Sequence, residues 1–189
     1  MIDVGRRVVL KAGMALGLGC GLGTRDAAAQ TDRTAGRPQE GDLLVRSGDA
    51  TKTPLTPRDI LNGAAQTAVW PMDPSDGTVR SGSRLNQVIL LRLDPDTLSA
   101  ETRARSADGV VAYTSICTHT GCDVDDWEPA GRLLACQCHS SQFDPRDGAK
   151  VVDGPAPRPL AALPLKIVDG KLAVAQPFTA PITFEKGVT

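Results

Sequence analysis

Most of the chemistry-bearing side chains of this sequence gather in two short boxes, residues 117–122 (CTHTGC) and 136–141 (CQCHSS). Together the boxes hold both histidines of the 189-residue chain and four of its five cysteines, with only Cys20 outside them. Thiolates and imidazoles are the side chains with which proteins hold zinc, copper and iron. Such clustering therefore predicts a metal site, or a metal site combined with a disulfide.

The order of residue types within the boxes bears on which metal is held. Structural zinc takes four ligands, and zinc fingers pair cysteine with cysteine and histidine with histidine. Here each box mixes the two types, and two cysteines are left over once four ligands are counted. In an oxidising compartment such leftover cysteines tend to form a disulfide. A [2Fe–2S] cluster held by two cysteines and two histidines fits this count, and a zinc site or a plain disulfide domain are the alternatives.

The boxes closely resemble the two motifs of the Rieske family, Cys-x-His-x-Gly-Cys and Cys-x-Cys-His-x-Ser. The resemblance implies one [2Fe–2S] cluster with two thiolates on an inner iron and two imidazoles on an outer, solvent-facing iron. The positions that match these four ligands are Cys117, Cys136, His119 and His139. The resemblance also implies a disulfide between Cys122 and Cys138 that joins the two cluster loops.

The resemblance extends to residues around the cluster. Pro155 lies in a Gly-Pro-Ala-Pro stretch that looks like the proline loop covering the cluster on its third side. Ser141 matches a serine whose hydroxyl donates a hydrogen bond to a bridging sulfide in high-potential members, although turn-capping is the plainer role of a serine. Gly121 is expected to adopt a positive φ beside the cluster, a conformation that is also ordinary for a loop glycine.

Three positions depart from the pattern of quinol-oxidising members of the family. Phe143 stands where high-potential respiratory members have a tyrosine that hydrogen-bonds a ligand sulfur, so we expect a lower reduction potential. Thr120 replaces the usual leucine that shields the cluster, and Gln137 replaces a common proline. These departures weigh against the membrane-anchored subunit of a quinol–cytochrome c reductase.

The segments that must position the boxes have the pattern of β-strands. Glycine (19) and proline (14) punctuate short apolar runs, which is typical of β-structure joined by loops. Residues 53–82 are expected to be loop-rich, and residues 96–105 to form a short helix capped by Asp96 or Thr97. Strands are expected at residues 43–45, 86–93, 110–116, 132–135, 150–152, 165–168 and 171–174.

The fold class expected from this pattern is all-β. Asp169-Gly170 is expected to join the last two strands as a hairpin. The Rieske resemblance implies an antiparallel β-sandwich over residues 42–189, with a small cluster-binding subdomain inserted at about residues 115–158. A net charge of −1, without a basic run beyond the extreme N-terminus, argues against nucleic acid as a partner.

Residues 1–29 have the pattern of an export signal. Arg6-Arg7 precede a short apolar stretch and small residues near Ala29, which resembles a twin-arginine signal. The twelve uncharged residues of 12–23 fall short of the ~20 that span a bilayer, so cleavage is favoured over an uncleaved membrane anchor. Residues 30–41 are then a linker. The protein is expected in the periplasm, or at the periplasmic face of the inner membrane if the signal is retained.

The function predicted from these features is periplasmic one-electron transfer through a Rieske cluster. The chain would be a small subunit or partner of a larger oxidoreductase, as in arsenite-oxidase-type enzymes, and its partner a catalytic subunit, a c-type cytochrome or a quinol-linked complex. One alternative is the Rieske subunit of a quinol–cytochrome c reductase, and another is a structural metal or disulfide domain. No substrate chemistry is expected in this chain alone, because the cluster uses both histidines and leaves none for a second iron site.

Overall fold

A computed structural model describes residues 33–185, so the expected export signal lies outside the described part of the chain. Within residues 33–185, no helix has the length and apolar character needed to cross a bilayer. Its short helical segments include 3-10 turns at Pro57–Asp59, Arg84–Asn86 and Pro95–Thr97, and helix α2 (Ala100–Ala104). The strands are β1 (Leu43–Arg46), β2 (Thr67–Met72), β3 (Val88–Arg92), β4 (Val110–Thr114), β5 (Asp126–Glu128), β6 (Leu133–Cys136), β7 (Ser141–Asp144), β8 (Lys150–Asp153), β9 (Leu165–Val168) and β10 (Lys171–Val174).

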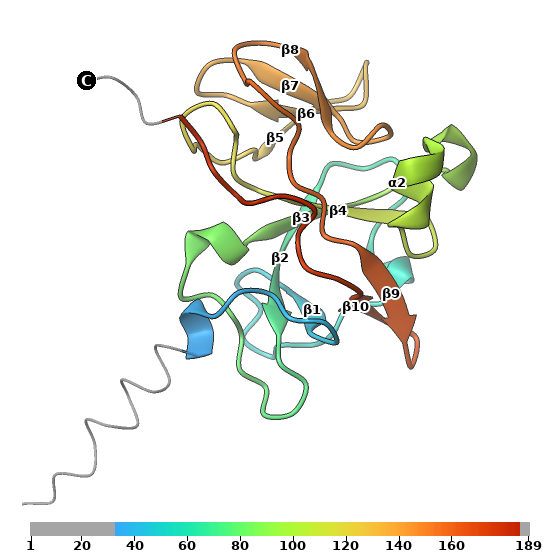
Figure 1. The fold of residues 1–189 in the computed structure, drawn as a ribbon. Helices are drawn as coiled ribbons and strands as arrows, with labels where there is room; N and C mark the ends of the chain where they lie inside the picture. The colour runs from blue at the N-terminus through green and yellow to red at the C-terminus, as the bar shows by residue number, and fades with distance from the viewer. Residues whose placement is uncertain (1–32, 186–189) are drawn as a thin grey trace, which may run out of the picture.

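The larger of two antiparallel sheets has the strand order β4-β3-β2-β1-β10-β9 (Figure 1). The first strand therefore lies at the centre, where Leu43 pairs with both β2 and β10. The sheet curls until its edges meet, because residues 161–163, just before β9, form backbone hydrogen bonds of 2.9 Å with β4. The expected all-β antiparallel class is confirmed, with the larger sheet closed on itself.

The sequences of β3 (VILLR) and β4 (VVAYT) are apolar without alternation because both faces of these strands are covered. Ile89 and Val111 pack in a core that they share with the smaller sheet. Leu90 and Val110, their neighbours along the strands, pack in a second core inside the curl of the larger sheet. Successive side chains leave opposite faces of a strand, so each strand contributes to both cores.

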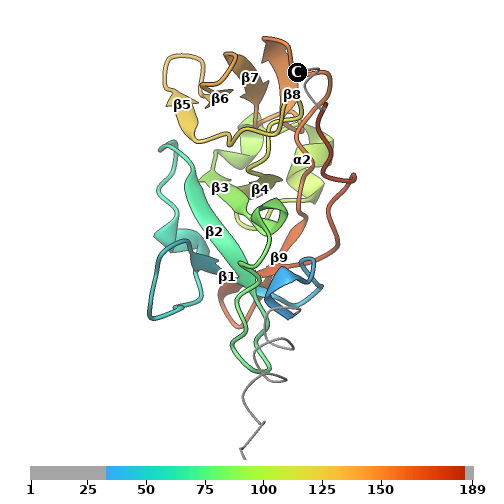
Figure 2. The same cartoon turned by 90° about the vertical axis from the view of Figure 1, so that its left-hand side faces the viewer.

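The smaller sheet, β5-β6-β7-β8, is built from residues between β4 and β9. Figure 2 shows it stacked on the end of the larger sheet, above β3 and β4. Leu134 of β6 and Phe143 of β7 pair across it and are fully buried in the shared core. The Tyr113 hydroxyl of β4 donates a hydrogen bond of 2.8 Å to the carbonyl of Pro145, which ties the two sheets together.

All seven strands expected from the sequence are present, with ends that differ by at most two residues, and the hairpin at Asp169-Gly170 is confirmed. Three strands are not predicted from the sequence: β2 lies in the region expected to be loop-rich, β5 is polar, and β7 begins with the last residue of the second box. Pro71, which has no N–H to donate, is compatible with β2 because the pairing with β3 ends at Val69. Beyond Val69, the Pro71 carbonyl accepts a hydrogen bond from the Arg80 N–H rather than from β3.

The single helix expected over residues 96–105 is wrong. Helix α2 begins only after Ser99, whose hydroxyl accepts a 3.3 Å hydrogen bond from a backbone N–H of the first turn. Ser99 is therefore the N-cap, rather than Asp96 or Thr97. The expected helix is interrupted at Leu98, whose backbone is extended and whose side chain is only 5% exposed. Burial of this side chain requires the extended conformation, so the helix cannot continue through it.

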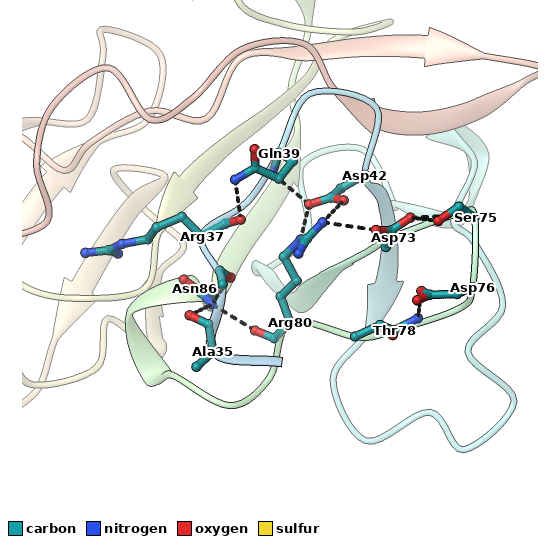
Figure 3. Close-up of polar contacts among 11 residues, drawn as sticks. Ala35, Arg37, Gln39, Asp42, Asp73, Ser75, Asp76, Thr78, Arg80 and Asn86 are labelled. Atoms are coloured by element: carbon teal, nitrogen blue, oxygen red, sulfur yellow. Dashed lines mark hydrogen bonds and ion pairs between the residues drawn. The ribbon is translucent and has the colours of Figure 1, made fainter. Parts of the chain in front are cut away.

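A polar cluster, here called the base clamp (Asp42, Arg80 and Asn86), fixes the segment before β1 to the loop after β2 (Figure 3). Arg80 donates to the Asp42 carboxylate from Nε (2.6 Å) and Nη2 (2.8 Å), and Asp42 is only 2% exposed. The Asn86 amide donates to the carbonyls of Ala35 and Gly36, the latter at 2.8 Å. Part of the expected linker therefore lies against the domain.

Candidate metal centre

The two boxes lie on facing loops. The first loop (residues 115–125) joins β4 to β5, and the second loop (137–140) is the turn between β6 and β7. In the first loop the Cys117 N–H donates to the Cys122 carbonyl (2.8 Å), and the Gly121 N–H donates to the Cys117 carbonyl (3.1 Å). Gly121 has a φ of +80°, in the left-handed region expected for it. These backbone bonds curl the first box so that its two cysteines approach each other.

A disulfide between Cys122 and Cys138 joins the first loop to the second. The two Cα atoms are 6.5 Å apart, and the pairing is the one that the resemblance implies. The sulfur atoms of Cys122, Cys136 and Cys138 lie within 4.8 Å of one another. The sulfurs of Cys122 and Cys138 are bonded to each other, so only Cys136 of these three can offer a thiolate to a metal.

Cys117 and Cys136 are the free cysteines of the described chain, and both are buried, with 1% and 2% exposure. Burial, together with the neighbouring Cys117, raises the pKa of the Cys136 thiol to about 11, although backbone N–H groups of the second loop act in the opposite direction. Without a cation the Cys136 thiol therefore stays protonated at neutral pH. A metal centre bound there must displace this proton and supply the positive charge that stabilises a buried thiolate.

His119 and His139 lie on the outer side of the same loops, the first half-buried and the second exposed. Their Nδ1 atoms are 3.2 Å apart, and the two rings meet edge to face, with centroids 4.6 Å apart and an interplanar angle of 85°. The two Nδ1 atoms thus lie close enough together for both to ligate one metal ion. The backbone places each imidazole within two or three residues of a buried thiol on its own loop.

The third loop (residues 154–159), which follows β8, contacts the other two. A Cβ on Gly154 would lie 2.5 Å from the Cα of Ser141, so only glycine permits this approach of third and second loops. The Ser141 hydroxyl accepts a 3.1 Å hydrogen bond from the Ala156 N–H, and its own proton is left for a further acceptor. Pro155 stands exposed between these two contacts, in the stretch expected to cover the cluster.

Phe143 is fully buried, and its ring packs in the shared core with Cys117 and Cys136. Position 143 therefore adds a ring, but no hydroxyl, to the core that contains the two thiols. Thr120 is half-exposed, and its hydroxyl lies 3.8 Å from the Cys122 sulfur. Gln137 is exposed in the second loop.

Four hydrogen bonds join the first loop to residues that no sequence pattern marks as functional. Arg84 donates to the Gly121 carbonyl (2.7 Å) and to Asp123 (2.7 Å). The Thr118 hydroxyl donates to a carbonyl of the third loop (2.7 Å). The Glu185 N–H donates to the His119 carbonyl (2.7 Å). Each partner is distant in sequence and of an ordinary residue type, so no motif marks it.

The donor set suits a [2Fe–2S] cluster better than zinc. Two thiols lie at the inner end of the facing loops and two imidazoles at the outer end, which matches a cluster with one iron held by sulfur and the other by nitrogen. The inner end is enclosed by apolar side chains, which lowers the dielectric around the thiolates, whereas the outer end is open to a partner. The four side chains that could hold the cluster are Cys117, Cys136, His119 and His139.

Comparison with known proteins agrees with this chemistry. The family model described as the Rieske [2Fe-2S] domain matches residues 74–164. The chain is 33% identical over 146 residues to the cytochrome bc1 complex Rieske iron-sulfur subunit of Streptomyces lividans, a match that covers 76% of this chain and 85% of that protein. It is 36% identical over 105 residues to a Rieske subunit of Haloferax mediterranei named for respiratory nitrate reductase, covering 54% of this chain and 47% of that one.

Other bc1 relatives of similar identity are longer, and the matched part makes up 41% or 34% of their length. Among solved structures, the ferredoxin of carbazole 1,9a-dioxygenase from Nocardioides aromaticivorans matches with a TM-score of 0.44 and 20% identity, covering 71% of this chain and 98% of that one.

Proposed function

The chain belongs to the Rieske [2Fe–2S] protein family, and from this premise we propose that Cys117, Cys136, His119 and His139 hold its one cluster and pass single electrons to a docked partner. The observation that carries the assignment is the 3.2 Å separation of the two histidine Nδ1 atoms, directly outside the two buried free thiols. Electron transfer of the Rieske type needs two different ends of the site. The charged thiolate end is kept from water, and the neutral imidazole end is accessible to a partner.

The cluster, when bound, supplies a group that accepts and returns one electron. The residues of the chain supply its surroundings. Burial of Cys117 and Cys136 excludes water from the thiolate end, and the half-buried His119 and the exposed His139 would present the cluster to a partner. The Ser141 hydroxyl accepts from the Ala156 N–H, which leaves its own proton free to stabilise negative charge on a bound cluster. Phe143 offers no such proton, which lowers the potential.

Two settings for this electron transfer are supported by different observations. The similarity to bc1 subunits supports the iron–sulfur subunit of a quinol–cytochrome c reductase at the periplasmic face of a membrane. The half-exposed Thr120 and the hydroxyl-free Phe143, together with the similarity to the nitrate-reductase-named subunit, support a small subunit of another periplasmic oxidoreductase. We favour the bc1-type setting, because that similarity covers more of the chain.

Electron paramagnetic resonance of the reduced protein tests the cluster assignment. A cluster with mixed sulfur and nitrogen ligands should give one signal whose average g lies below the free-electron value, and His139→Ala should abolish it. Ser140→Ala changes the exposed neighbour and should leave the signal intact. A signal that survives His139→Ala would overturn the ligand set.

Deletion of the gene in its host separates the two settings. In the bc1-type setting, quinol-dependent cytochrome c reduction by isolated membranes should be lost and should return with the gene. Membranes that keep this activity would favour the other oxidoreductase.

A further inference from the structure

The last described residues, 178–185, form a strap that runs from the end of β10 to the first loop. Figure 1 shows it as the dark red trace leaving the centre of the molecule and reaching the loop before β5. Electron transfer by the proposed ligands does not by itself require this segment. The strap nevertheless forms hydrogen bonds with the body of the protein along its length and with the first loop at its end.

The strap is anchored along its length before it reaches the loop. The Thr179 N–H donates to the Ala162 carbonyl (2.9 Å), and the Thr179 hydroxyl accepts from the Ala162 N–H (3.0 Å). Ile182, 9% exposed, packs with Ile116 in a small core of its own. Arg158 of the third loop donates from Nη2 to the Thr183 carbonyl (2.5 Å). The direction of the last two residues is therefore fixed by the body of the protein.

Those last two residues contact the first box on both sides of Thr120. A Cβ on Gly121 would lie 2.8 Å from the ring of Phe184, so the ring covers Gly121 as closely as a glycine permits. The Glu185 N–H donates to the His119 carbonyl at 2.7 Å. Both contacts are to backbone, so the metal-binding side chains stay available.

We propose that the strap is a positioning element for His119, with Phe184 and the Glu185 N–H holding the backbone from which that imidazole projects. This role rests on the proposed function of His119 as a cluster ligand. His119 precedes a glycine in left-handed conformation by two residues, a point where the backbone is easily displaced. The strap opposes that displacement from outside the loop, while the loop's own hydrogen bonds and Arg84 restrain Cys117 and Gly121.

Glu185→Pro removes the donor N–H, and Glu185→Ala is its control because it keeps the N–H and loses the carboxylate. Loss of one neutral hydrogen bond should raise the rate of cluster loss about five-fold, equivalent to about 1 kcal/mol. The reduced signal of Glu185→Pro should also broaden in g, as the geometry at the imidazole becomes less uniform. Glu185→Ala should match the unmodified protein in both measurements.

A second pair of variants covers the case in which proline disturbs the end of the chain. A chain that stops after Thr183 lacks both contacts and should show the larger effect, whereas one that stops after Glu185 keeps both and should be unaltered. Hydrogen exchange of the Gly121 and Cys122 amides, measured without a cluster, should be faster only in the chain that stops after Thr183.

The outcomes separate this role from the ligand assignment. If the unmodified protein lacks the Rieske signal, the proposed function fails, and amide exchange alone still decides whether the strap holds the loop. If the signal is present but Glu185→Pro and the shorter chain retain its g-values, rate of cluster loss and amide exchange, the positioning role is refuted. Equal effects of Glu185→Ala and Glu185→Pro would also refute it, because the carboxylate would then be responsible.

Discussion

Two regions of the molecule, the cluster end made of the first, second and third loops and the base clamp, hold chain segments in place with different kinds of bond. The base clamp fixes a chain segment with side chains, through the buried bidentate pair of Asp42 and Arg80 and the amide of Asn86. The cluster end fixes its loops mainly with backbone hydrogen bonds and the Cys122–Cys138 disulfide. Side chains that ligate a metal are not available to form the hydrogen bonds that hold the surrounding loops.

Asp42→Ala tests the base clamp and should have the largest effect on stability. It leaves the Arg80 guanidinium, 11% exposed, without its bidentate partner, and removing one member of a buried pair costs about 3–5 kcal/mol in the free energy of unfolding. Urea unfolding measures the loss, and Glu40→Ala, which removes an exposed ion pair with Lys166, should change little. The g-values of the reduced cluster should not move. A change in those g-values would show that the base clamp and the cluster end are coupled.

The double variant Cys122→Ser/Cys138→Ser tests the covalent restraint at the cluster end. The disulfide closes a separation of 16 residues, for which about 3 kcal/mol of stabilisation is expected. In contrast with Asp42→Ala, cluster loss should accelerate as well, because the two loops can then separate. Unchanged cluster retention would mean that backbone bonds and ligands alone hold the loops.

Ser141→Ala should show an effect on both stability and potential. It strips the buried Ala156 N–H of its acceptor, at a cost of about 1–2 kcal/mol, and removes the hydroxyl proton. The midpoint potential should fall, as measured by redox titration. Ser140→Ala, at an exposed neighbour, should leave both quantities unaltered. A potential that does not fall would assign Ser141 to turn structure alone.

Phe143→Tyr should raise the midpoint potential without a large change in stability. A phenol hydroxyl beside the thiolate end adds one hydrogen bond to sulfur, and about 1 kcal/mol of preference for the reduced state corresponds to roughly 40 mV for one electron. Phe143→Leu keeps the position apolar and serves as the control. No rise, or a fall, would contradict the account of Phe143.

Alkaline pH should weaken the contact between the sheets by a small amount. Burial raises the pKa of Tyr113 above its ordinary value of 10.0, so the folded protein keeps the phenol proton that the unfolded chain releases. This contribution to stability is full below pH 10 and declines as pH rises further. Tyr113 is the single tyrosine, so tyrosine absorbance reports its titration directly. Tyr113→Phe should remove this part of the alkaline decline, and an unaltered decline would assign it to other groups.

The sequence was informative where the determinants are local. The cysteines and histidines that could bind a metal lie within two hexapeptides. Dense apolar runs such as that of β3 predict strands that are buried on both faces. It was uninformative where the determinant is a partner distant in the chain. Arg84 meets Gly121 across 37 residues and Arg80 meets Asp42 across 38, and nothing in the local pattern of an arginine reveals either. The strand β2 could not be predicted for a related reason, since Pro71 is acceptable in it only because the pairing with β3 ends at Val69.

The course of the strap has a practical consequence for protein engineering. Because Glu185 ends beside His119, a tag or fusion partner attached behind it would crowd the surface where a redox partner must approach. The described chain begins beside the base clamp, where Gly36 accepts from Asn86, and Figure 1 shows this start on the side of the molecule away from the smaller sheet. A purification tag, a fluorescent reporter, an electrode linker or a fused cytochrome is therefore better attached ahead of residue 33. Attached there, it leaves the surface around His119 and His139 unobstructed.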